Sequence, residues 1–216
     1  MISGPRFSTE AGRLEAFSDG VMAVIITIMV LELRPPDGTD LRSLYALIPT
    51  FSAYVLSFAF IGIYWNNHHH MLRASDGIDG RAMWANLHLL FWLSLVPFTT
   101  AWLGRNAFAP VPTALYGFVL LMDAIAFTIL QTALLRVNGP AGDFAKAVNA
   151  DLKGKVSFAL YVAAIAISFL STIAADALFV TVAVLWIVPD RRFESVIANR
   201  SDGRKNADGG GGSTTR

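Results

Sequence analysis

Residues 13–33 decide the fold, and they read RLEAFSDGVMAVIITIMVLEL. Charged and polar side chains stand at the start of this stretch, namely Arg13, Glu15, Ser18 and Asp19, and a long apolar run follows them. A helix needs about 20 mostly apolar residues to cross a bilayer. Residues 16–33 approach this length, so we predict a first transmembrane helix there, with ionisable groups at its mouth.

The composition of the whole chain agrees with a membrane protein. Hydrophobic residues make up 54% of the 216 residues, and charged residues only 15%, against about 25% in a soluble domain. A soluble domain of this size keeps about a third of its chain surface in water, so it cannot hide this much apolar surface. The chain has no cysteine, which excludes a disulfide framework and a thiolate metal site.

Further apolar runs of similar length follow the first one. Pro35 and Pro36 end the first run, because proline cannot continue a helix. The apolar stretch at residues 156–188 holds a single charge, Asp176, and is too long for one helix, so we expect a tight outer hairpin that turns near Asp176. We predict an all-α bundle of six transmembrane helices, at residues 16–33, 44–65, 82–103, 113–135, 156–172 and 174–188.

The composition also divides the chain and orients it. Residues 1–190 hold the six-helix domain, and the polar, glycine-ending tail at residues 191–216 is expected to be a disordered cytoplasmic segment. If the N-terminus is cytoplasmic, every Lys and Arg falls on a cytoplasmic segment except Arg34, Arg42 and Arg105. Cytoplasmic loops carry such an excess. We therefore predict a multi-pass protein of a prokaryotic cell membrane with both termini cytoplasmic.

A helical projection at 100° per residue sorts the first helix into faces. One arc holds a stripe of small, apolar and hydroxyl-bearing side chains: Gly20, Val24, Thr27, Ile28 and Leu31. For an isolated helix, such a face also suits close helix–helix packing in lipid. The polar residues at the start of this helix also allow a simpler interpretation. Ser18 or Asp19 could cap a helix that begins at the membrane interface.

Three sequence blocks resemble a known family. The motif R-x-x-x-F-S-D-G-V at residues 13–21 looks like the signature of the prokaryotic branch of the transmembrane-protein-175 family of potassium channels. The blocks N-L-x-x-L-F at residues 86–91 and V-P-F-T at residues 96–99 resemble the family's third helix, and W-x-x-H-H at residues 65–69 resembles the end of its second helix. The resemblance covers the first three helices. Beyond Leu103, only hydropathy and order match.

The resemblance implies a homotetramer of six-helix subunits whose four first helices line a central pore. It implies passive conduction of cations, with potassium favoured over sodium, and no enzyme activity. Carried over by position, an apolar constriction falls on Val24, where isoleucine is more usual, and a hydroxyl ring on Thr27. Further apolar rings fall on Ile28 and Leu31, and such rings gate a pore by dewetting. Potassium ions would pass transiently near Thr27, without a structural metal or a cofactor.

The resemblance also implies that the motif residues Arg13, Phe17, Ser18, Asp19 and Gly20 frame the pore. We predict a buried network in which Arg13, Ser18 and Asp19 meet the second and third helices, with Asn86 and either His68 or His69 as partners. An unpaired Asp19 in that setting costs several kcal/mol, so it needs a partner or a proton.

Two other functions compete with a channel. A proton-coupled secondary transporter needs a carboxylate near the bilayer midplane, and Asp123 is the only deep candidate. The histidines His68, His69, His70 and His88 suggest a membrane metalloprotein, but consecutive histidines on one helix cannot all point the same way.

We expect the partners to be further copies of the chain, membrane lipid, potassium and other monovalent cations. Nucleic-acid binding has no support, because the basic residues are scattered over the loops.

Overall fold

The computed structural model describes residues 6–75, 77–139, 144–145, 148 and 152–187, and its regular elements are all helices. In chain order the helices are α1 (Arg6–Leu31), α2 (Leu41–Tyr45), α3 (Ile48–Ala74), α4 (Gly80–Leu93), α5 (Val96–Arg105), α6 (Pro110–Asn138), α8 (Leu152–Ile167) and α9 (Thr172–Ile187). The predicted tail at residues 191–216 lies outside the described residues, as does the end of the predicted domain at residue 190.

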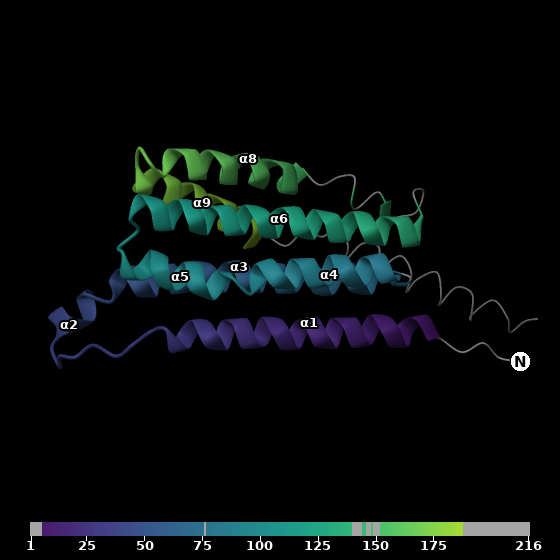
Figure 1. Cartoon of the computed structure of the whole chain (residues 1–216), viewed down its shortest axis with the longest axis horizontal. Coiled ribbons are helices and arrows are strands. Elements are labelled where there is room, and N and C mark those ends of the chain that lie inside the picture. The colour runs from purple at the N-terminus through teal and green to yellow at the C-terminus, as the bar shows by residue number, and fades with distance from the viewer. Residues whose placement is uncertain (1–5, 76, 140–143, 146–147, 149–151, 188–216) are drawn as a thin grey trace, which may run out of the picture.

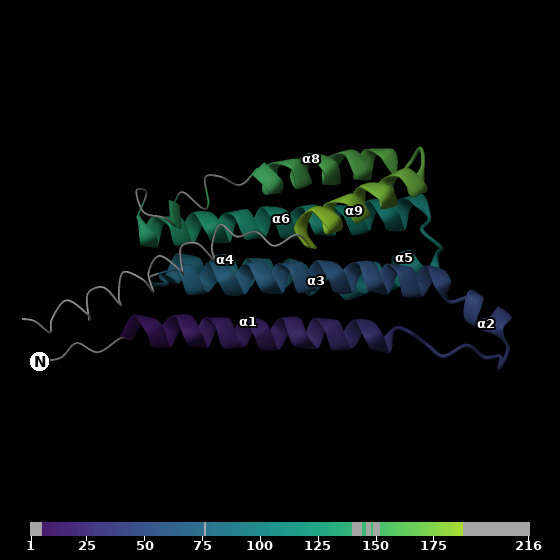
Figure 2. The same cartoon turned by 180° about the vertical axis from the view of Figure 1, so that it is seen from behind.

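The long helices lie side by side with their axes nearly aligned (Figure 1). Helix α1 forms one edge of the bundle and packs on α3, α4 and α5. Helix α6 packs on α4 and α5, and α8 and α9 cover α6 on the side away from α1 (Figure 2). The helix at the edge is the one that carries the predicted stripe.

Four helical stretches are long and apolar enough to cross a membrane: Glu10–Leu31, Ile48–Ala74, Gly80–Arg105 and Pro110–Asn138. The shortest has 22 residues, about 33 Å at 1.5 Å per residue, which exceeds a hydrocarbon core of about 30 Å. Helices α8 and α9 have 16 residues each, or about 24 Å. The all-helical, membrane-type bundle is thus confirmed, and the last two predicted spans correspond to these shorter helices.

Two predicted boundaries are wrong because a helix continues beyond its apolar run. Helix α1 begins at Arg6, not at residue 16, so Ser18 and Asp19 lie in mid-helix and the capping interpretation is wrong. Helix α3 continues to Ala74, past the predicted end at residue 65, and includes the histidines. Hydropathy locates only the lipid-soluble part of a helix, whereas backbone hydrogen bonds also form in polar segments.

Two other predictions differ from the structure at turns. The predicted span at residues 82–103 lies within the membrane-length stretch Gly80–Arg105, but a turn at Ser94 and Leu95 divides this stretch into α4 and α5. Pro97 then lies in the first turn of α5, where its missing N–H is tolerated. The outer hairpin turns at residues 168–171 and not near Asp176, which lies inside α9. The Ser171 hydroxyl accepts a hydrogen bond from the Ala174 N–H at 3.3 Å and so takes the capping position.

The core has two parts. One part joins α1 to α3, α4 and α6 around Met22, Tyr64 and Leu89. The other part joins α3, α5, α6, α8 and α9 around Tyr116 and Phe179. This second part depends on a close approach, because a Cβ atom at Gly117 of α6 would lie 2.7 Å from the Phe179 ring.

Candidate ion-conduction surface

Helix α1 has a buried face and an exposed face. Met22, Ile25 and Met29 on the buried face belong to the core shared with α3, α4 and α6. Val24 and Leu31 on the opposite face are 54% and 78% exposed in the single chain. The exposed face carries the whole predicted stripe: Gly20, Val24, Thr27, Ile28 and Leu31. The described residues of this chain therefore leave the stripe largely uncovered.

Thr27 lies in the middle of the stripe, between apolar side chains. Its hydroxyl donates a hydrogen bond to the Val24 carbonyl at 2.9 Å. The proton is thus directed back to the helix, and the oxygen lone pairs remain available on the exposed side. Such an oxygen can accept a contact from a cation or from its hydration water.

Helix α1 is tied to the bundle by a buried chain of hydrogen bonds. The Asn86 amide of α4 donates to the Ser18 hydroxyl at 2.9 Å, and the Ser18 hydroxyl donates to the Leu14 carbonyl at 2.8 Å. The His68 Nε2 of α3 lies 2.7 Å from the Asn86 carbonyl oxygen. Because that oxygen can only accept, His68 carries its proton on Nε2. Ser18, His68 and Asn86 are fully buried and connect α1, α3 and α4.

A second polar cluster lies half-buried along the seam between α1 and α3. The Trp65 indole N–H donates to the Asp19 carboxylate at 3.0 Å. The His69 Nδ1 lies 2.7 Å from the Glu15 Oε1, and the rings of Trp65 and His69 stack with their centroids 5.9 Å apart. Asp19 and His69 are thus brought together, but outside the buried chain of Ser18.

Arg13 is exposed, so the prediction that it joins the buried network is wrong. Five residues separate Arg13 from Ser18, which turns the two side chains about 140° apart on a helix. Arg13, Phe17 and Gly20 instead share the exposed face with Val24. The motif therefore has two parts, with Ser18 directed into the bundle and Arg13 and Phe17 directed away from it.

A groove of about 940 Å³ runs beside the stripe, between α1 and α5. Val24 and Ile28 line one side, and Pro97 and Phe98 line the other. An ion pair between Glu32, just after α1, and Arg105, at the end of α5, also borders it. Sequence reasoning missed this pair, although both residues fall at the outer ends of the first and third predicted spans.

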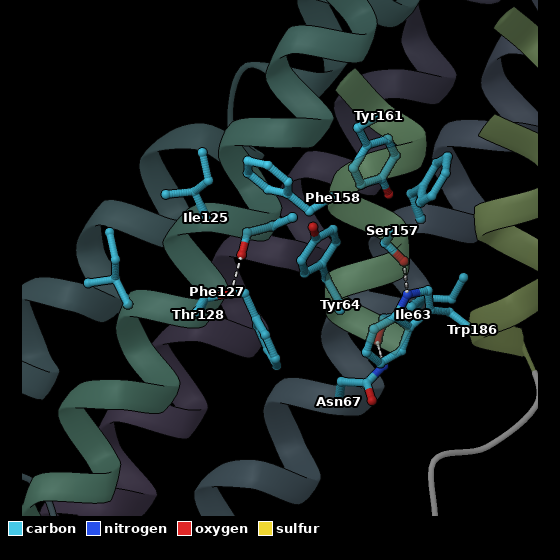
Figure 3. Close-up of a pocket in the computed structure, with 14 residues that line it drawn as sticks. Ile63, Tyr64, Asn67, Ile125, Phe127, Thr128, Ser157, Phe158, Tyr161 and Trp186 are labelled. Atoms are coloured by element: carbon cyan, nitrogen blue, oxygen red, sulfur yellow. Dashed lines mark hydrogen bonds between the residues drawn. The ribbon is translucent and has the colours of Figure 1, made fainter. Parts of the chain in front are cut away.

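The other two candidate functions depend on residues away from the stripe. Asp123 of α6 is fully buried, and neither of its carboxylate oxygens has a hydrogen-bond partner among the described residues. The adjacent Ala124 borders a separate cavity of about 240 Å³, which is lined by α3, α6, α8 and α9 (Figure 3). Its wall includes the hydrogen bond from the Trp186 indole to the Ser157 hydroxyl, 2.8 Å long.

Three of the four histidines, His68, His69 and His88, do not converge on one site. His68 belongs to the buried chain, and His69 lies at the seam between α1 and α3. His88 accepts a hydrogen bond from the Trp92 indole within α4, at 2.9 Å. A metal site built from several histidines, the alternative that the sequence left open, is therefore not formed by His68, His69 and His88.

Helix α1, at the edge of a bundle of apolar helices, is held on one face by buried hydrogen bonds. Its other face leaves an apolar and hydroxyl-bearing stripe exposed, an arrangement that suits a helical membrane channel. The family model described as "Endosomal/lysosomal potassium channel TMEM175" matches residues 13–97. A potassium channel of Chryseobacterium sp. (strain P1-3) is 49% identical over 183 residues, which cover 85% of this chain and 95% of that protein. The chain belongs to the TMEM175 family.

Two further comparisons extend this result. The crystal structure of a lysosomal potassium-selective channel TMEM175 homolog from Chamaesiphon minutus superposes with a TM-score of 0.74 and 31% identity, over 84% of this chain and 98% of that one. The human protein named endosomal/lysosomal proton channel TMEM175 is 38% identical over 71 residues, which are 27% of this chain and 14% of that protein. These are ion channels and not enzymes, as the sequence predicted.

Proposed function

We propose that this chain is a cation channel that conducts potassium passively, in preference to sodium, as a homotetramer. The observation that carries the proposal is the stripe on α1, which is exposed in one subunit although the opposite face of the same helix is bonded into the bundle. The names of the bacterial relatives as potassium channels support the choice of ion.

The proposed pore forms where four copies of α1 face a common axis. Because α1 lies at the edge of its subunit (Figure 1), its stripe is free to face the same stripe of other copies. Val24 and Leu31 are seven residues apart, so the lining between them spans about 10 Å along the helix. Thr27 lies within this segment and Ile28 beside it, which places a hydroxyl ring between apolar rings.

The proposed selectivity follows from partial dehydration. Apolar rings at Val24, Ile28 and Leu31 form a constriction that water leaves readily, which gates the pore. Four Thr27 oxygens offer partial replacement for lost hydration water. Potassium holds its hydration shell less tightly than sodium, so this replacement favours potassium. The stripe holds no charge, and we expect the preference for potassium to be modest.

The remaining parts of the proposal concern topology. Helices α8 and α9 serve as the fifth and sixth spans, and both termini and the polar tail at residues 191–216 are cytoplasmic. The lysines and arginines of the inner loops support this orientation. The protein then lies in the cell membrane of a prokaryote, with lipid around the outer helices.

Potassium flux from liposomes tests the proposal. We expect the wild type to release potassium without a proton gradient, Val24→Trp to block the flux, and Thr27→Ala to reduce the preference for potassium over sodium. Val30→Trp is the matched control, because Val30 is also an exposed valine of α1, at 44%, but it points about 120° away from Val24. Equal block by both tryptophans would contradict a pore lined by the stripe.

The same assay separates the channel from a transporter. A channel tolerates Asp123→Asn, because Asp123 lies in α6 and not on the stripe. If the potassium flux requires a proton gradient and disappears in Asp123→Asn, the protein is a proton-coupled carrier and not a channel. Native mass spectrometry of the purified protein tests the tetramer, and a dimer as the largest species would refute the four-fold pore.

A further inference from the structure

The structure assigns a second ion site, at the seam between α1 and α3. We propose that Glu15, Asp19 and His69 bind one divalent transition-metal ion of the zinc type within a single subunit. One potential ligand atom from each of the three residues lies within 4.8 Å of the other two. Glu15 and Asp19 are four residues apart and share one face of α1, while His69 comes from α3, so an ion here would join two helices.

The arrangement of the ligand atoms supports binding. The His69 Nδ1 lies 2.7 Å from the Glu15 Oε1. An ion at this place would replace that direct contact by a bond to each of the two atoms. Their side chains are 27% and 23% exposed, which leaves a path for an ion from water.

Trp65 orients two of the ligands. Its indole N–H donates to the Asp19 Oδ1, which leaves the other carboxylate oxygen of Asp19 available for an ion. Its ring stacks on the His69 ring. Outer contacts of this kind fix ligand orientation in protein metal sites and raise affinity. Trp65 therefore acts as a positioning residue for the site.

The ligand types select the class of ion. One imidazole nitrogen and two carboxylate oxygens suit zinc and neighbouring transition metals, whereas calcium and magnesium take oxygen ligands. Zinc–ligand distances of about 2.0–2.2 Å place ligand atoms no more than about 4.4 Å apart. Small side-chain rotations bring the three atoms into this range, and water completes the tetrahedral coordination.

The site lies away from the stripe. Asp19 and Glu15 point about 140° and 180° away from Val24 around the axis of α1. An ion bound there would not enter the conduction path. It would add a second link between α1 and α3, beside the buried bonds of Ser18, Asn86 and His68, and would restrain movement of the helix that carries the stripe. The site would thereby regulate conduction.

Direct binding tests the site on the purified full chain in detergent, with zinc as the titrant in isothermal calorimetry. We expect saturable binding of one ion per chain and a rise of the unfolding temperature with zinc. Loss of a ligand in His69→Gln or Asp19→Asn is expected to weaken binding by at least about tenfold. Asp19→Asn keeps the oxygen that accepts the Trp65 hydrogen bond, so it removes a ligand with little change to the seam.

His88→Gln is the matched control, because it removes a histidine that is engaged with Trp92 within α4. This variant should bind zinc like the wild type, and magnesium should not replace zinc. A wild type without saturable binding would overturn the proposal. The proposal would also be overturned if His69→Gln and Asp19→Asn both bound zinc as tightly as the wild type.

The regulatory part rests on the proposed channel function and has its own readout. Zinc is expected to lower potassium flux from liposomes with the wild type but not with His69→Gln. Equal inhibition of both would place the inhibitory ion elsewhere and overturn the regulation. A protein that binds zinc at His69 but conducts no potassium would refute the channel and leave the site standing, whereas a conducting protein without zinc binding would refute the site alone.

Discussion

The buried hydrogen bonds from Ser18 through Asn86 to His68 are expected to make a measurable contribution to the free energy of unfolding, because they hold α1 on the bundle. Asn86→Leu keeps a side chain of similar size but removes two hydrogen bonds, one to the Ser18 hydroxyl and one from His68. Hydrogen bonds between helices in membrane proteins average about 0.6 kcal/mol and reach about 1.7 kcal/mol. Loss of both bonds is therefore expected to lower the free energy of unfolding by about 1–3 kcal/mol.

Unfolding of the purified protein by sodium dodecyl sulfate in mixed micelles measures this loss. Ser18→Ala is the partial control, because, of the two bonds between helices, it removes only the one between Ser18 and Asn86, together with the bond from Ser18 to the Leu14 carbonyl within α1, and should cost about half as much. Both single variants lose the bond between Ser18 and Asn86, and the double variant loses it only once. Its loss in the free energy of unfolding should therefore be smaller than the sum of the two single losses. Val30→Ala, an exposed change on the same helix, should have little effect.

The reasoning would be refuted if Asn86→Leu unfolded like the wild type, or if the effects of Ser18→Ala and Asn86→Leu were fully additive. The first result would mean that the buried bonds contribute nothing to the position of α1. The second would mean that Ser18 and Asn86 act independently, in contrast to the 2.9 Å contact between them.

Three other predictions concern separate parts of the chain. Val24→Ile adds one methylene to the proposed constriction and should reduce potassium leak from liposomes; a variant that conducts more than the wild type would contradict this. Gly117→Ala places a Cβ atom 2.7 Å from the Phe179 ring and should destabilise the protein by about 1–3 kcal/mol in the same unfolding assay; a variant as stable as the wild type would contradict this close approach. Hydrogen bonds from Ser43 lower the pKa of the Asp40 carboxyl. The charged carboxylate therefore stabilises the start of α2 at neutral pH, and this stabilisation is lost as the pH falls through the lowered pKa. The NMR chemical shift of the Ser43 amide, followed as a function of pH, should report this titration. Asp40→Ala should abolish the pH dependence.

The sequence predicted which face of α1 is exposed better than it predicted the polar contacts of the same helix. The 3.6-residue period alone assigns Val24 and Leu31 to one face, and that face is the exposed one. The link between Ser18 and Asn86 was predicted with the help of the family resemblance. Arg13 was assigned wrongly, because its place in a compact motif suggested a shared partner although the helical turn separates it from Ser18.

Other features depend on choices that a single sequence leaves open. Ser171 and Asp176 are both good helix caps, and only the packing of α8 on α9 selects Ser171. Pro97 is compatible with a kink inside one helix as well as with the first turn of a new helix. The contact between Glu15 and His69 depends on how α1 lies against α3, and neither residue signals it alone.

The division of α1 into a bonded face and an open face also bears on how such a channel can change over time. Side chains on the open face contact few groups of their own subunit, so most replacements there have little consequence for folding of that subunit. Mutation can therefore alter the proposed pore lining at Val24 or Thr27 while the fold of the chain remains intact. Related channels can diverge in ion preference on an unchanged scaffold, and a laboratory library confined to these positions would sample conductance while retaining most of its folded members.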